Sequence, residues 1–170
     1  MYLTSPRILW LAILMIFANV MFVGCAGKRP AYLGGLQTDL NPCPSKPNCV
    51  SSLAQDDQHK VEPIGYEGPR ERAMNRIKKI VETDNRGKII YAGPTYVYAE
   101  YTSRIFGFVD DVEFLAIIDN PGVQVRSASR LGYSDMGVNR KRIDALRAEF
   151  KKLQATDKSA KTTNENEGSK

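Results

Sequence analysis

The stretch VDDVEFLAIIDNPGVQVRSASRL, residues 109–131, decides the fold of this chain. It predicts a β-hairpin, because two runs rich in β-branched and apolar residues flank the turn sequence DNPG. Side chains alternate across a strand, and the register of a hairpin is strongly selected where one face is buried. We therefore expect Val112 and Phe114 to share a buried face with Val125, through a loop of two or four residues.

The opposite face of the same hairpin collects charged residues. Asp111 and Glu113 lie on the first strand. Arg126 and Arg130 lie on the second, so cross-strand ion pairs are expected, each contributing about 0.2–1 kcal/mol. The preceding strand, residues 95–103, extends this face if its other side chains point to the buried side. The charged face is expected to contain Tyr96, Tyr98, Glu100, Asp111, Glu113, Arg126 and Arg130.

Two interpretations of this charged face remain open. Tyrosines, carboxylates and guanidinium groups on one surface could bind a polar or anionic ligand. They could equally form an ion-pair network that binds nothing and is covered by residues 43–64. Sheets with one solvated face are common, so the pattern alone does not decide between them.

Two amphipathic helices flank the strands. Residues 68–84 place Met74 and Ile77 on one side of a helix, and residues 137–153 do the same with Ile143 and Phe150. A short strand at residues 88–92 joins the first helix to the other strands. This order predicts an α+β domain, with an antiparallel sheet of about four strands and both helices packed on one face.

The N-terminus predicts a secreted protein. Residues 8–23 are apolar except for Asn19, a run shorter than the roughly 20 residues that span a bilayer. The sequence FVGC at residues 22–25 resembles the lipobox of bacterial lipoproteins. The resemblance implies cleavage before Cys25 and a membrane anchor of acyl chains on it, and the absence of Asp after the cysteine implies an outer-membrane protein that faces the periplasm. An uncleaved signal anchor is the alternative.

Two cysteines remain after lipidation, Cys43 and Cys49. An even number of cysteines in an oxidising compartment favours one disulfide. A zinc site is the alternative, but it would need two more ligands, and His59 is the single histidine of the chain. We therefore expect no metal site, and no sequence feature calls for a cofactor.

The chain is expected to divide into four parts. Residues 1–24 form the signal peptide, residues 25–40 a tether, residues 41–154 one domain, and residues 155–170 a disordered polar tail. The net charge of +5 is mild and the basic residues are scattered, so nucleic-acid binding is not expected.

Several motifs resemble a family known as domain of unknown function 1499. The similar pieces are NPCPSKPNCVSS, FGFVDDVEF and VRSASRLGYSDMGVNRKRIDALR, and the resemblance runs from Leu40 to Leu153. It implies no reaction, substrate or cofactor. The motif positions are Cys43, Cys49, Ser51, Ser52, Asp110, Asp111, Glu113, Arg126, Ser127, Ser129, Arg130, Ser134, Asp135, Asn139 and Arg140.

Other chemistry has weak support in the sequence. A serine triad could be written with Ser51, His59 and Asp56, but no nucleophile-elbow motif is present. Asp135 is expected to cap the last helix, where Asn139 and Arg140 are either structural or bind an anion. We expect a non-enzymatic envelope protein that binds a partner or a polar ligand on the charged face. A hydrolase acting on a cell-wall or lipid substrate is the alternative.

Overall fold

The computed structural model describes Trp10, residues 26–118 and residues 122–167, with side chains as far as Ser159. Cys25 and, apart from Trp10, the predicted signal peptide lie outside the described residues. Within the described part of the chain, no helix combines the length and the apolar character that crossing a membrane requires.

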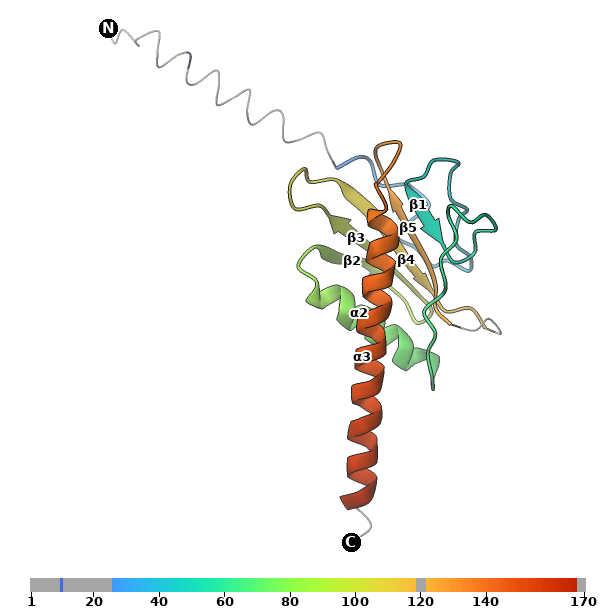
Figure 1. Ribbon diagram of the computed structural model, residues 1–170, viewed down its shortest axis with the longest axis vertical. Helices are drawn as coiled ribbons and strands as arrows, with labels where there is room; N and C mark the ends of the chain where they lie inside the picture. Colours follow the sequence, from blue (N-terminus) through green and yellow to red (C-terminus); the bar gives the residue numbers. More distant parts are fainter. Residues whose placement is uncertain (1–9, 11–25, 119–121, 168–170) are drawn as a thin grey trace, which may run out of the picture.

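A five-stranded antiparallel sheet forms the centre of the molecule (Figure 1). The strand order is β1-β5-β4-β3-β2. The α+β class predicted from the sequence is confirmed, with one more strand than expected. The additional strand is β1, a three-residue segment that pairs with β5 at the edge of the sheet. The strands are β1 (Cys49–Ser51), β2 (Gly87–Ala92), β3 (Tyr96–Thr102), β4 (Val109–Leu115) and β5 (Gln124–Ser129).

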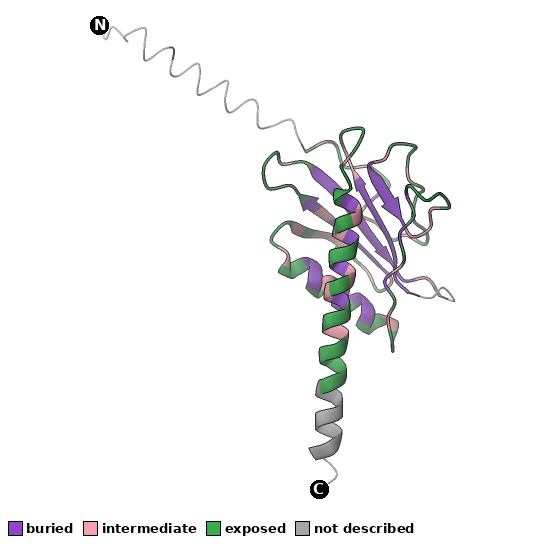
Figure 2. Cartoon of the chain, viewed as in Figure 1, coloured by how far each residue is buried: buried purple, intermediate pink, exposed green. Residues whose placement is uncertain are grey.

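Both helices, α2 (Arg70–Thr83) and α3 (Val138–Glu167), lie in front of the same face of the sheet in Figure 1. Their apolar side chains form one core with the side chains of that face, as the helical periodicity predicted. Figure 2 shows the central strands as buried and much of the described part of α3 as exposed. The main contributors to this core are Met74, Ile77, Val81, Val97, Ala99, Val112, Phe114, Val125, Ile143, Leu146 and Phe150.

The register of the β4–β5 hairpin confirms the predicted side-chain parity. Phe114 lies opposite Val125, so the apolar residues of the two strands share the helix-packed face. The predicted loop of two or four residues is wrong, because the strands already separate after the pair Leu115 and Gln124. Val123, the residue before β5, does not pair with β4. It exchanges two backbone hydrogen bonds of 2.9 Å with Ile64 instead.

The second face of the sheet is covered by the N-terminal segment. Residues 26–40, which were expected to form a tether, place Leu33 and Leu40 in a second apolar cluster with Tyr96, Tyr98 and Leu115. Residues 43–64 were the expected cover, yet from that range only the half-buried Leu53 packs against this cluster. We call residues 26–40 the covering segment. Its sequence has no regular apolar period, so it was predicted to be a tether. The sheet is therefore enclosed on both faces.

Helix α3 continues to Glu167, beyond the domain boundary expected at residue 154. Residues 154–167 contain neither glycine nor proline, so no residue in them stops the helix. Its extension contacts α2, because Asp157 accepts a hydrogen bond of 2.8 Å from Nε of Arg76. The first residues of the expected polar tail thus take part in the packing of the two helices.

Cys43 and Cys49 form the predicted disulfide. The bond joins the loop before the sheet to the first residue of β1, and Cys49 is buried there. Both sulfur atoms are used in this bond, so the alternative of a zinc site on these cysteines does not apply.

Candidate functional site

The charged face predicted from the sequence lies on the side of β3, β4 and β5 that is turned away from the helices. In the sheet register Glu113 lies opposite Tyr98 on β3 and Arg126 on β5. Asp111 is likewise the partner of Glu100. Because alternation is kept along neighbouring strands, all seven predicted residues gather on this face. We call these seven side chains the charged network.

Glu113 and Arg126 form the most deeply buried ion pair of the charged network. Nη1 of Arg126 donates to Oε2 of Glu113 at 3.0 Å, and the hydroxyl of Tyr96 donates to Oε1 at 2.9 Å. The Glu113 side chain has no exposed surface. Burial raises the pKa of Glu113, although the neighbouring guanidinium of Arg126 opposes this rise. Both oxygens of the carboxylate are occupied.

Arg130 is the centre of the other half of the charged network. Its Nε and Nη2 donate to the two oxygens of Asp111 at 3.0 and 2.7 Å, a two-pronged contact. Nη2 also donates to Glu100 and, at 3.0 Å, to the hydroxyl oxygen of Tyr98. The Tyr98 hydroxyl in turn donates to Asp111. One guanidinium therefore pairs with two carboxylates, and its single positive charge balances only one of them.

Arg29 from the covering segment completes this half of the network. Its Nε donates to Oε1 of Glu100 at 2.7 Å, and its guanidinium carbon lies 5.9 Å from the ring centre of Tyr98. Burial acts to raise the pKa of Glu100, but the hydrogen bonds from Arg29 and Arg130 outweigh it and hold that pKa below its ordinary value. Glu100 is therefore ionised at neutral pH.

The structure brings all seven predicted residues together, but in a closed arrangement. Five cavities of about 200–360 Å³ among the described residues are lined by other side chains. The covering segment occupies the space in front of the network. Binding of a ligand by these residues stays a prediction, and it would require that segment to move.

A second polar cluster lies on the helix side of the sheet and was not found from the sequence. Asp110 pairs with Arg142 of α3, whose Nη1 donates to Oγ of Ser127 at 2.9 Å. The hydroxyl of Ser127 donates to Oδ1 of Asn139 at 2.6 Å, and Nδ2 of Asn139 donates to the carbonyl of Asn48 at 3.0 Å. The sequence signal that could have indicated this cluster is the pair Ser127 and Ser129, two serines between the apolar residues of β5. These contacts fasten α3 to β4, to β5 and to the residue that precedes β1.

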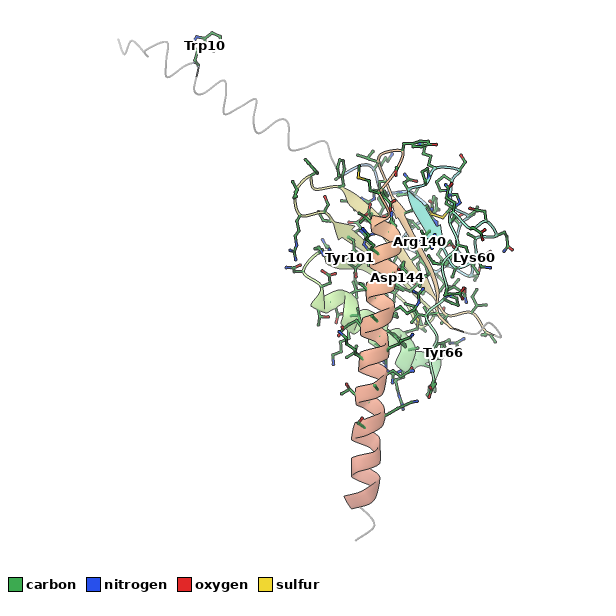
Figure 3. The ribbon with its side chains drawn as sticks, in the orientation of Figure 1. Trp10, Lys60, Tyr66, Tyr101, Arg140 and Asp144 are labelled. Atoms are coloured by element: carbon green, nitrogen blue, oxygen red, sulfur yellow. A yellow bond between two sulfur atoms is a disulfide. The ribbon has the colours of Figure 1, made fainter. Side chains whose placement is uncertain are left out.

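The start of α3 is held by two further motif residues. Asp135 caps the helix as predicted, because its carboxylate accepts the backbone N–H of Gly137 at 2.9 Å and of Asn139 at 2.7 Å. Arg140 donates to the carbonyl of Lys60 at 2.7 Å (Figure 3). Its guanidinium therefore ties the helix to the segment that precedes α2, which supports the structural interpretation over anion binding.

The serine triad considered from the sequence is not assembled. Nδ1 of His59 lies 2.7 Å from Oδ1 of Asp56, and Nε2 lies 3.1 Å from the carbonyl oxygen of Lys46. Both of these neighbours are hydrogen-bond acceptors, and the side-chain amide nitrogen of Gln58 lies 3.3 Å from the same Nε2. With both ring nitrogens engaged, neither is left to accept a proton from Ser51.

This arrangement of His59 predicts a pH-dependent stability. The hydrogen bond to Asp56 raises the pKa of His59, and burial and Arg140 oppose the rise. The stabilisation is complete below the unfolded-state pKa of about 6.5 and is lost as the pH rises through the higher folded-state pKa. We expect the melting temperature of the wild type to fall between mildly acidic and mildly alkaline pH, more than that of Asp56→Asn. Melting curves that respond identically to pH in both proteins would contradict this.

Two loops at one end of the sheet border the remaining candidate site. Residues 103–108 connect β3 to β4, and residues 130–137 connect β5 to α3. A cavity of about 200 Å³ lies between them. Its polar groups already have partners: Asp110 pairs with Arg142, and Ser134 accepts the N–H of Met136. The cavity is lined by Ser103, Phe108, Val109, Asp110, Ser129, Leu131, Gly132, Ser134, Asp135 and Val138.

Taken together, the fold and the site define an α+β domain whose sheet carries a buried acid–arginine network under an N-terminal cover. The chain belongs to the family described as Protein of unknown function (DUF1499), whose model matches residues 39–150. That range contains the sheet, α2 and the first part of α3, as far as Phe150. No curated protein and no solved structure matches the chain.

Proposed function

We propose that this protein is a lipid-anchored binding module of the bacterial cell envelope, held in the outer membrane through Cys25 and facing the periplasm. The lipobox-like sequence FVGC supports the anchor. The absence of Asp at position 26 supports the outer membrane over the inner one. On this proposal the mature protein begins at Cys25, one residue before the described part of the domain.

The observation that carries the non-enzymatic part of the proposal is the closure of the charged network. An acid or base catalyst needs a carboxylate that can reach the substrate. Here Glu113 and Asp111 are bonded on both oxygens and buried beneath the covering segment. The closed network therefore favours a binding role over acid–base catalysis by these residues, and the proposal places the interaction with a partner or a polar ligand at the solvent-exposed surface of the domain.

Replacing Cys25 tests the anchor. Cys25→Ala is expected to abolish labelling of the protein by radioactive palmitate and to move it from the membrane fraction to the soluble fraction, because no thiol remains to be acylated. The double variant Cys43→Ala, Cys49→Ala is the matched control and should stay labelled and membrane-bound. Continued palmitate labelling of Cys25→Ala would overturn the proposed anchor.

A further inference from the structure

Large apolar side chains are exposed at one end of the domain, on the two loops at residues 103–108 and 130–137 and on Val138, the first residue of α3. Ile105 is 80% exposed and Met136 is 89% exposed. Single exposed apolar residues are ordinary, but a contiguous group marks an interaction surface. We call this group the loop patch: Ile105, Phe106, Phe108, Leu131, Tyr133, Met136 and Val138.

The two loops form one surface. Phe108 lines the 200 Å³ cavity together with Leu131 and Val138. A neighbouring cavity of about 320 Å³ is bordered by Ile105 and Phe106 of the first loop and again by Val138. In Figure 1 the β3–β4 and β5–α3 loops lie at the same end of the sheet, opposite the C-terminus of α3.

The N-terminal segment enters the domain beside this patch. A Cβ placed on Gly27 would lie 3.1 Å from Cγ of Leu131 and 2.9 Å from Cβ of Arg130, so the backbone at Gly27 is packed against the second loop. Two peptide links separate Gly27 from Cys25, and their Cα atoms are therefore at most about 7 Å apart. Acyl chains on Cys25 would bring the membrane surface to the edge of the loop patch.

The charge around the patch suits a lipid surface. Lys28 and Arg104 are exposed cations at its border. The one acid within the two loops, Asp135, is engaged with backbone N–H groups at the start of α3. Anionic headgroups attract cationic side chains by about 1 kcal/mol for each Lys or Arg near the surface.

The backbone holds Met136 outward. Its φ of 54° is in the left-handed region, which a residue other than glycine rarely adopts. The conformation is supported by hydrogen bonds from Met136 N to Oγ of Ser134 at 3.2 Å and from Gly137 N to Asp135 at 2.9 Å. Residues in sparsely populated backbone conformations cluster at functional sites.

We propose that the loop patch docks into the lipid leaflet that holds the acyl chains of Cys25. This inference rests on the proposed lipid anchor and adds an orientation to it. Apolar and aromatic side chains sink into the headgroup region, about 5–10 Å deep, while Lys28 and Arg104 contact the phosphates. The acyl chains supply most of the affinity, and the patch fixes which end of the domain faces the membrane.

Site-directed fluorescence in the full lipidated chain tests the orientation. Ile105→Cys and Met136→Cys, each labelled with the dye NBD, are compared with the matched control Lys151→Cys on the exposed part of α3. Each introduced thiol is the sole one free, because Cys43 and Cys49 are bonded to each other. In vesicles of phosphatidylethanolamine and phosphatidylglycerol, nitroxide lipids should quench the dyes at positions 105 and 136 several-fold more than the dye at position 151.

The possible outcomes separate this inference from the anchor. An acylated protein that floats with the vesicles but carries equally weak quenching at all three positions overturns the docking and leaves the anchor intact. A blue shift at positions 105 and 136 without quenching by lipid nitroxides indicates contact with another protein chain and also overturns the docking. A protein without acyl chains overturns the anchor, and with it the inference.

Discussion

Replacing Arg130 by alanine is expected to lower the free energy of unfolding by about 3–5 kcal/mol, the cost of removing one partner from a buried ion pair. The Arg130 side chain is 6% exposed and its partner Asp111 is 3% exposed. Without the guanidinium, Asp111 keeps only the Tyr98 hydroxyl, and Glu100 keeps Arg29. Two carboxylates would then repel each other in a poorly solvated space. Urea denaturation of the purified protein measures the loss.

A matched control is the surface arginine Arg86, whose side chain is 49% exposed and pairs with Asp84. Arg86→Ala should change the free energy of unfolding by less than about 1 kcal/mol, as expected for an exposed pair. A loss of similar size in both variants would contradict the structural role of Arg130. Unchanged stability of Arg130→Ala together with lost binding of an envelope ligand would identify the charged network as a ligand site after all.

Alanine substitutions in the covering segment give the second large effect. Leu33→Ala and Leu40→Ala are each expected to cost about 2–5 kcal/mol, the range for a leucine in a packed core. Both side chains lie against Tyr96, Tyr98 and Leu115 and are 5–7% exposed. Leu36 belongs to the same segment but is 66% exposed, so Leu36→Ala is a matched control that should leave stability unchanged. Thermal and chemical unfolding of the three variants makes the comparison.

The outcome also decides how residues 26–40 work. If all three leucine variants unfold like the wild type, the segment is weakly held and could open to admit a ligand to the charged network. If Leu33→Ala and Leu40→Ala lower the free energy of unfolding and Leu36→Ala does not, the segment is a permanent layer of the fold. Each carboxylate of the covered network is paired with an arginine, which leads us to expect the second result.

The sequence predicted the parity of the strands correctly because alternation depends only on the strand period and on one buried face. Phe114 and Glu113 therefore stand on the sides that the pattern indicated. The predicted length of the β4–β5 loop was wrong, because Ile64, which is distant in sequence, takes the backbone hydrogen bonds of Val123. Local patterns contain no information about such a partner.

The cover of the charged face was missed for a related reason. Residues 26–40 contain glycines and isolated leucines without a period, and only the folded sheet gives Leu33 and Leu40 a surface to pack on. The pairing of Asp110 with Arg142 was missed as well, since a helix and a strand approach each other at a point that periodicity does not specify. The disulfide was predicted because an even number of cysteines is left once Cys25 is assigned to lipidation, and the structure forms that bond.

The two edge strands of the sheet, β1 and β2, affect how the protein behaves when many copies are close together. If Cys25 anchors the chain as proposed, its copies would collide side by side in the plane of the membrane, where unpaired strand edges favour polymerisation. The margin at β1 offers only three residues and is pinned by the Cys43–Cys49 bond, while β2 has an irregular register between Ile89 and Tyr91. Neither margin presents a long, flat ladder, so crowded copies of this chain should remain separate molecules.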